Sequence, residues 1–217
     1  MIKAVLFDID GTLVDSNELH VDAWLEAFAS ENIAVTREAV RRQIGKGADQ
    51  LVPTLVPGAD AALVERLGDA HGHAFKPLLP TVQPFPGASA LLKRAHASGR
   101  QVVLASSASA AEVAHYVDLL DLRDILAATT SADEVEHSKP APDIFLAALR
   151  KLDGVRADEA IVVGDTPYDV AAARDAGIAA VGVQSGGFSD SDLRGAVGLY
   201  DGVEALLRGF EESPLAG

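Results

Sequence analysis

The feature that most constrains the fold is a regular alternation of strand and helix patterns over residues 88–210. Each strand pattern is a short apolar run, and each helix pattern repeats apolar residues at helical spacing. We expect strands at residues 101–105, 125–129, 160–163, 178–183 and 198–200, and helices at 88–97, 110–120, 143–152, 168–176 and 203–210. Repeated units of this kind favour a parallel sheet with helices on both faces, because right-handed crossovers return each strand in the same direction.

The part of the chain that precedes this region carries one strand pattern and then only helix patterns. The strand is expected at residues 4–7, and the helices at 17–29, 37–44, 49–55 and 60–75. Residues 80–87 contain three prolines and a glycine, which is typical of a stiff connector. We therefore predict an α/β fold. Its Rossmann-like core comprises residues 1–15 and 83–217, and an all-helical cap is inserted as residues 16–82.

Composition argues against several classes of function. Hydrophobic residues make up 48% of the 217 residues, which is enough for a substantial core. The formal net charge is -14 and the basic residues are scattered, so nucleic-acid and membrane partners are disfavoured. The absence of cysteine excludes thiol nucleophiles and agrees with a reducing compartment. We expect no signal peptide and no membrane span, and hence a cytoplasmic protein that is a monomer or a homodimer.

The first strand ends in the sequence Asp-Ile-Asp-Gly-Thr, residues 8–12. Asp8 and Asp10 are two positions apart, so in an extended segment their side chains leave the same face. Gly11 permits a sharp turn at this point. Open α/β folds bind their ligands beyond the carboxyl ends of the strands, which is where these acids lie.

Three more strand-to-helix junctions carry polar side chains that complement these acids. Ser106 and Ser107 follow the strand at 101–105, Lys139 precedes a helix that begins at prolines, and Asp165 and Asp169 flank a helix start. Taken singly, the serines are typical helix caps, Lys139 is typical of a solvated loop, and each acid is typical of a helix start. Parallel strands bring all these junctions to one edge of the sheet, where the groups complement one another.

Four carboxylates at one sheet edge require a compensating cation. Two like charges about 4 Å apart repel by about 4 kcal/mol at an effective dielectric constant of about 20. Carboxylates without histidine or cysteine favour a hard divalent ion, and Mg²⁺ typically binds through a few carboxylates plus substrate oxygens. With Lys139, the Ser106 hydroxyl and loop amides nearby, the edge is suited to a phosphate group.

These motifs resemble those of the haloacid dehalogenase superfamily, in its phosphatase branch with a helical cap. The matching segments are Asp-x-Asp-Gly-Thr-Leu-Val-Asp-Ser at 8–16, the strand-end Ser106, Ser-Lys-Pro-x-Pro-Asp at 138–143 and Gly-Asp-Thr-x-x-Asp at 164–169. The resemblance implies an aspartyl phosphate on Asp8, with Asp10 as general acid and base. It further implies that Mg²⁺ is held by Asp8, the Asp10 backbone carbonyl and Asp165, with Asp169 supporting the metal site.

The same resemblance implies a substrate site formed by Thr12, Ser106, Ser107 and Lys139. In the cap, the loop of residues 44–49 resembles the family's substrate-selecting loop, and we expect Lys46 to contact the substrate. A helix-breaking turn with a solvated lysine is the alternative interpretation of this loop. His71 and His73 could form a metal pair, but we expect both on an exposed, solvated helix face.

The leading interpretation is a Mg²⁺-dependent hydrolase of a small phosphorylated metabolite, either phosphoglycolate or a sugar phosphate. The dehalogenases lack the second acid, which Asp10 provides here, and no cap lysine lies in a phosphonatase signature. A β-phosphoglucomutase-like enzyme is the main alternative, because residues 18–24 resemble the mutase cap start, in which His20 would assist closure. A catalytically silent binding protein is a further alternative, disfavoured by the intact motifs.

Overall fold

The computed structural model describes residues 1–217 and contains a six-stranded sheet in the order β5-β4-β1-β6-β7-β8. Every neighbouring pair in it is parallel. The strands are β1 (Ala4–Phe7), β4 (Gln101–Ala105), β5 (Leu126–Thr130), β6 (Ala160–Gly164), β7 (Ala179–Val183) and β8 (Gly198–Tyr200). The predicted α/β class with a parallel Rossmann-like sheet is confirmed. Because β1 pairs in parallel with β4 on one side and β6 on the other, the carboxyl ends of these three strands lie side by side.

Alternate residues of β1 point to opposite faces of the sheet, and each face is covered by helices. Val5 and Phe7 belong to the hydrophobic cluster formed with α5 (Ala88–Ala97), α6 (Ala110–Leu119) and α9 (Val203–Arg208). Ala4 and Leu6 belong to the cluster formed with α7 (Asp143–Arg150) and α8 (Pro167–Asp175). All four β1 residues are fully buried, so the strand ends at a fixed position in the middle of the core.

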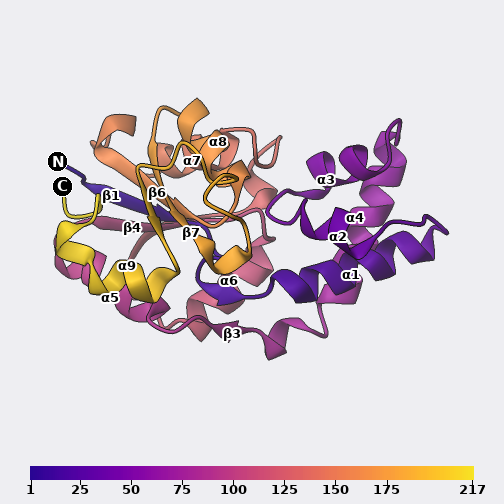
Figure 1. Ribbon diagram of the computed structural model, residues 1–217, viewed down its shortest axis with the longest axis horizontal. Helices are drawn as coiled ribbons and strands as arrows, with labels where there is room; N and C mark the ends of the chain where they lie inside the picture. The colour runs from indigo at the N-terminus through magenta and orange to yellow at the C-terminus, as the bar shows by residue number, and fades with distance from the viewer.

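The four helices of the cap are α1 (Asn17–Ser30), α2 (Arg37–Arg41), α3 (Ala48–Leu55) and α4 (Ala61–Phe75). They form a hydrophobic cluster of their own, with Trp24, Phe28 and Leu67 among its members. In Figure 1 this indigo-to-magenta group lies at one end of the molecule, and both chain termini lie at the opposite end. None of the helices combines the length and the apolar character needed to cross a bilayer.

The two chain crossings between core and cap lie side by side. β2 (Val14–Asp15) and β3 (Gln83–Pro84) form a two-stranded antiparallel ribbon in which Val14 pairs with Pro84. The sequence predicted only a stiff connector here, because a proline-rich segment lacks the alternation of a strand. Short strands with one paired edge tolerate proline, so the ribbon ties both ends of the cap to one place beside β1.

Element ends differ from the sequence prediction by a few residues. The helix expected at 37–44 ends at Arg41, and residues 42–45 continue as turns to Gly45, which has a φ of 101°. The helix expected at 143–152 ends at Arg150, and that expected at 203–210 ends at Arg208. These shifts arise where apolar residues in the following turn extend the helical pattern beyond the hydrogen-bonded helix.

Candidate active site

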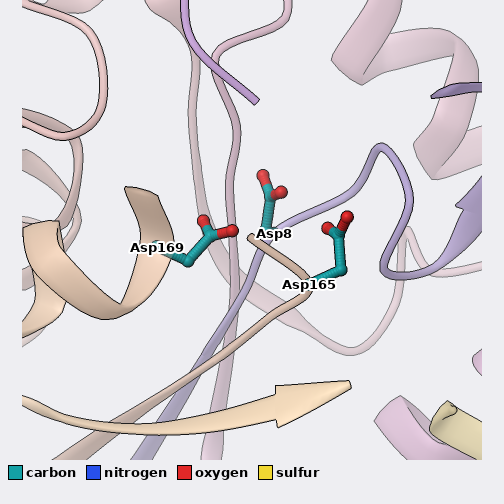
Figure 2. A group of neighbouring side chains, drawn as sticks. All are labelled: Asp8, Asp165 and Asp169. Atoms are coloured by element: carbon teal, nitrogen blue, oxygen red, sulfur yellow. The ribbon is translucent and has the colours of Figure 1, made fainter. Parts of the chain in front are cut away.

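Three buried carboxylates meet at the carboxyl edge of the sheet. Asp8 directly follows β1, Asp165 directly follows β6, and Asp169 lies in the first turn of α8 (Figure 2). One oxygen atom from each lies within 4.8 Å of the other two, and the side chains are almost completely buried. The convergence follows from the topology, since β1 and β6 are neighbouring parallel strands with Phe7 paired to Val163.

Burial and mutual repulsion disfavour the ionised form of Asp8 and Asp165 when no metal ion is bound. Burial is the main cause that raises the pKa of Asp8 to about 7; Lys139 opposes this shift and Asp169 adds to it. Burial, together with the charges of Asp169 and Asp8, also raises the pKa of Asp165 well above its usual value. Closely spaced hard oxygen donors that tend to hold protons fit a divalent cation, which would displace those protons.

Lys139 is the cation that this structure provides. Its Nζ atom lies 2.6 Å from Asp8 Oδ1 and 2.7 Å from Asp169 Oδ1, and the residue is 0% exposed. The interpretation of Lys139 as a solvated loop lysine is therefore wrong. Although burial lowers the lysine pKa, the charges of Asp169 and Asp8 outweigh it and raise the pKa above its usual value. Asp169 also accepts hydrogen bonds at Oδ2 from the Thr166 amide (3.0 Å) and hydroxyl (2.6 Å).

The side chain of Asp10 is not part of this group, which corrects the expectation of four crowded carboxylates. Its Oδ1 atom accepts hydrogen bonds from the Ser16 hydroxyl (2.6 Å) and the Tyr116 hydroxyl (3.0 Å), and lies 3.2 Å from His20 Nε2. Burial raises the pKa of Asp10, but the His20 imidazole and these hydrogen bonds outweigh it and lower the pKa to about 2. The pKa of Asp8 is therefore raised and that of Asp10 lowered, although the two residues are only two positions apart.

Thr12 supports Asp165. Its hydroxyl donates to Asp165 Oδ1 at 2.7 Å in the buried interior, and Thr12 is not among the residues that line the cavity described next. Gly11, with a φ of 75°, passes so close to the same carboxylate that a Cβ atom would lie 2.4 Å from Asp165 Oδ2. The Asp10-Gly11-Thr12 segment therefore contributes Asp10 and also fixes the position of Asp165.

A cavity of about 430 Å³ lies between the core and the cap. Its core side includes Asp8, Asp10, Ser106, Ser107 and Lys139, and its cap side includes His20, Lys46 and His71. The Ser106 hydroxyl is buried and accepts from the Ala108 amide at 3.1 Å. Most of the core residues that the sequence singled out therefore line one cavity. The exceptions are Thr12, Asp165 and Asp169, which are not among its lining residues.

The cap loop of residues 44–49 contacts several core junctions at once. Ser107 donates to the Gly45 carbonyl at 3.3 Å, and the Gly47 amide donates to the Ser138 hydroxyl at 2.9 Å. Lys46 is half-buried; its Nζ donates to Gln43 Oε1 at 2.7 Å and lies 4.5 Å from the centre of the Tyr168 ring. The loop is therefore held against the carboxyl edge of the sheet, and Lys46 is more than a solvated turn residue.

Replacing Gly45 by alanine should weaken this contact. The φ of 101° strains any side chain there, and the new Cβ would lie 2.8 Å from Thr166 Cγ2 on the core. We expect kcat/KM to fall by about tenfold or more, because small displacements at such a site are costly. Gly58 is the matched control: its φ is 88°, yet no atom lies within 4 Å of a Cβ there. Equal activities of Gly45→Ala and Gly58→Ala would show that the loop contact is unimportant.

Sequence reasoning missed Ser16, Tyr116 and His71. The expectation that His71 is solvated is wrong: it is largely buried and stacks on Trp24, whereas His73 is exposed as expected. A signal was present, because Leu67, His71 and Phe75 recur every fourth residue and both apolar members are fully buried. No sequence signal indicates a functional role for Tyr116, since it occupies an ordinary buried position of the amphipathic helix α6.

Comparison with known proteins identifies the class to which this fold and site belong. The family model for haloacid dehalogenase-like hydrolases matches residues 2–177. The chain therefore belongs to the haloacid dehalogenase-like hydrolase family.

Individual relatives agree with this assignment. The phosphoglycolate phosphatase of Rhodospirillum rubrum is 34% identical over 218 residues, covering 95% of this chain and 90% of that protein. The crystal structure of a hydrolase from Pseudomonas syringae is 32% identical, with a TM-score of 0.91 over 98% of this chain and 99% of that one. A variant of CbbY from Rhodobacter sphaeroides, solved with xylulose-(1,5)-bisphosphate, is 26% identical, with a TM-score of 0.79 over 95% and 96% of the two chains.

Proposed function

We propose that this protein is a Mg²⁺-dependent phosphomonoester hydrolase of a small phosphorylated metabolite, acting through an aspartyl phosphate on Asp8. The observation that carries the proposal is the Asp8 carboxylate, which lines the cavity 2.6 Å from the buried Lys139 ammonium. A carboxylate held there can attack phosphorus while the ammonium offsets charge on the phosphoryl oxygens. Asp8, Asp165 and Asp169 would hold the Mg²⁺, which supplies further positive charge when bound.

Asp8 and Asp10 have different parts in the two steps of the reaction. In the first, an Asp8 oxygen bonds to phosphorus and the bond to the leaving alcohol breaks, while Asp10 gives that alcohol a proton. In the second, Asp10 takes a proton from a water molecule and the oxygen of that water bonds to phosphorus, while the bond between phosphorus and the Asp8 oxygen breaks and free phosphate leaves. A bound anionic phosphoryl group raises the pKa of Asp10 and so favours the protonated carboxyl group that the first step needs.

Five cavity residues are placed to hold and select the substrate. Ser106, Ser107 and Lys139 lie along the core wall, where they can bind phosphoryl oxygens, and Lys46 and His20 lie on the cap side. Phosphoglycolate and sugar monophosphates are the substrate candidates, in keeping with the phosphoglycolate phosphatase among its relatives.

A sugar phosphomutase of the β-phosphoglucomutase type is the second candidate. The contact between His20 and Asp10 favours it, because the corresponding histidine assists acid–base work in the mutases that residues 18–24 resemble. Against it, no arginine lines the cavity, and Lys46 is its only lysine apart from Lys139. A single cap-side cation suits a substrate with one phosphate better than one that must bind through two.

Free phosphate release separates these candidates. The protein is incubated with Mg²⁺ and a panel containing phosphoglycolate and several sugar monophosphates, and phosphate and isomerised sugar are both quantified. We expect free phosphate from at least one ester. Isomerised sugar phosphate with little free phosphate would favour the mutase. No turnover of any ester with any divalent ion would leave only the silent binding protein.

Mg²⁺ binding should weaken as the pH falls through about 7. The pKa of Asp8 is raised to about 7 and that of Asp165 is raised as well, so below this pH the metal must displace protons that the metal-free site holds. Each displaced proton reduces the apparent affinity by up to about tenfold per pH unit. Calorimetric Mg²⁺ titrations at about pH 6 and about pH 8 measure the difference. Activity should disappear with EDTA and return with Mg²⁺, and equal affinity at both pH values would contradict the buried carboxylate site.

A further inference from the structure

A row of three side chains runs from the core into the cap. Asp10 Oδ1 lies 3.2 Å from His20 Nε2, and His20 Nδ1 lies 3.2 Å from His71 Nε2. Asp10 follows β1 in the core, whereas His20 is on α1 and His71 on α4. His71 therefore contacts the proposed proton-transfer residue only through His20.

Aromatic packing fixes the planes of both imidazoles. The His20 ring stacks on Phe75 with centroids 3.8 Å apart and an angle of 15° between the planes. The His71 ring stacks on Trp24 at 4.3 Å and 17°. With the ring plane held in this way, the hydrogen bond at Nδ1 acts together with the Nε2 contact to select one of the two flipped orientations of the His20 ring.

The chemistry of the row assigns a definite part to each nitrogen. An ionised Asp10 only accepts hydrogen bonds, so the His20 nitrogen that faces it, Nε2, carries a hydrogen. Nδ1 of His20 then either accepts from His71 Nε2–H or donates to the lone pair of that atom. A neutral His71 can be either the donor or the acceptor in this hydrogen bond. Burial, followed by the charge of His20, lowers the pKa of His71 to about 3 and so favours this neutral form.

We propose that His71 is a positioning residue: its hydrogen bond to His20 Nδ1 holds the imidazole so that Nε2–H stays directed at Asp10. This inference rests on the proposed function, because it concerns the orientation of the imidazole that faces Asp10, the proposed general acid and base. His73 has no such part: it lies on the same helix, is exposed, and its Nδ1 lies 2.7 Å from the Asp69 carbonyl oxygen.

Three variants separate the hydrogen bond from the packing. His71→Leu keeps an apolar side chain in the space beside Trp24 and removes the hydrogen bond. His71→Gln keeps a polar atom near the position of Nε2. His73→Leu makes the same replacement on the exposed side of the same helix and is the control. Far-UV circular dichroism and thermal unfolding establish that each variant is folded before activity is compared.

The leaving group reports on proton transfer from Asp10. For an alkyl phosphate that the wild type cleaves, we expect kcat/KM of His71→Leu to fall by about tenfold, as expected from a buried hydrogen bond. For p-nitrophenyl phosphate, whose leaving group needs little protonation, the fall should be below about threefold. His71→Gln should recover most of the loss, and His73→Leu should match the wild type. In a His20→Ala background, His71→Leu should have little further effect.

Each outcome bears on one claim. Equal losses on both phosphates, no recovery by glutamine, or the same loss in the His20→Ala background would overturn the positioning role, because a structural defect affects both substrates alike. Phosphate release by the wild type with unchanged His71→Leu kinetics would also overturn it while leaving the proposed function intact. A wild type that releases no phosphate from any ester would instead overturn the proposed function itself.

Discussion

Asp8→Asn should reduce phosphate release by about ten-thousandfold or more while the protein stays folded. Asparagine keeps the shape of the side chain, but its amide does not form a covalent bond to phosphorus. No other carboxylate in the group replaces it: Asp165 is held by Thr12, and Asp169 is held by Lys139 and Thr166. Steady-state phosphate release with Mg²⁺, together with thermal unfolding, measures both parts of the expectation.

Asp69→Asn is the matched control for this variant. Asp69 lines the same cavity from the cap but is exposed and lies outside the buried carboxylate group. Its replacement removes one negative charge from the cavity wall, and activity should stay within about threefold of the wild type. Activity in Asp8→Asn comparable with that of Asp69→Asn would show that the Asp8 carboxylate is not the nucleophile.

Lys139→Met should damage stability and activity together. The ammonium contacts Asp8 and Asp169 at 2.6 and 2.7 Å in a fully buried position, so its loss leaves two buried acids without their cation. Breaking a buried pair in this way typically costs about 3–5 kcal/mol of unfolding free energy. The loss of charge stabilisation at the phosphoryl group should lower kcat by about a thousandfold. Denaturant unfolding without metal and phosphate release with Mg²⁺ measure the two effects.

Lys93→Met provides the comparison on the surface. Its Nζ lies 2.7 Å from Asp121 Oδ2, but both side chains are largely solvated, and such pairs contribute at most about 1 kcal/mol. An unfolding free energy of Lys139→Met no lower than that of Lys93→Met would mean that the buried acids do not depend on Lys139. Added Mg²⁺ should narrow the stability difference between Lys139→Met and the wild type, whereas it should stabilise Lys93→Met and the wild type equally.

The sequence was sufficient to predict the core of the site because strand ends in a parallel sheet share one edge. Asp8 and Asp165 each follow a short apolar run, and those runs prove to be neighbouring strands. The sheet class, the helical cap and the approach of Ser106 and Lys139 follow from the same pattern. The strand order itself was not predictable, since apolar runs carry no label for their partners.

Contacts between segments that are far apart in the chain could not be predicted from the sequence. Asp10 was predicted to crowd with the other acids, but Ser16 beside it and the distant Tyr116 hold its carboxylate away from them. The hydrogen bond between His20 and His71 joins residues on two cap helices, and the interhelical packing alone brings them together. The ribbon at Val14 and Pro84 likewise depends on the meeting of two segments far apart in the chain.

The most direct test is to trap the phosphorylated enzyme. Asp10→Asn lacks the base for the second step, so a phosphoenzyme formed from a substrate with an activated leaving group should accumulate. Acid quenching, proteolysis and peptide mass spectrometry then locate the added phosphoryl group. We expect it on Asp8, in amounts that depend on Mg²⁺ and vanish in the Asp8→Asn/Asp10→Asn variant. Phosphorylation of another residue, or a wild type that turns over substrate while no Asp8 phosphate is ever trapped, would contradict the proposed mechanism.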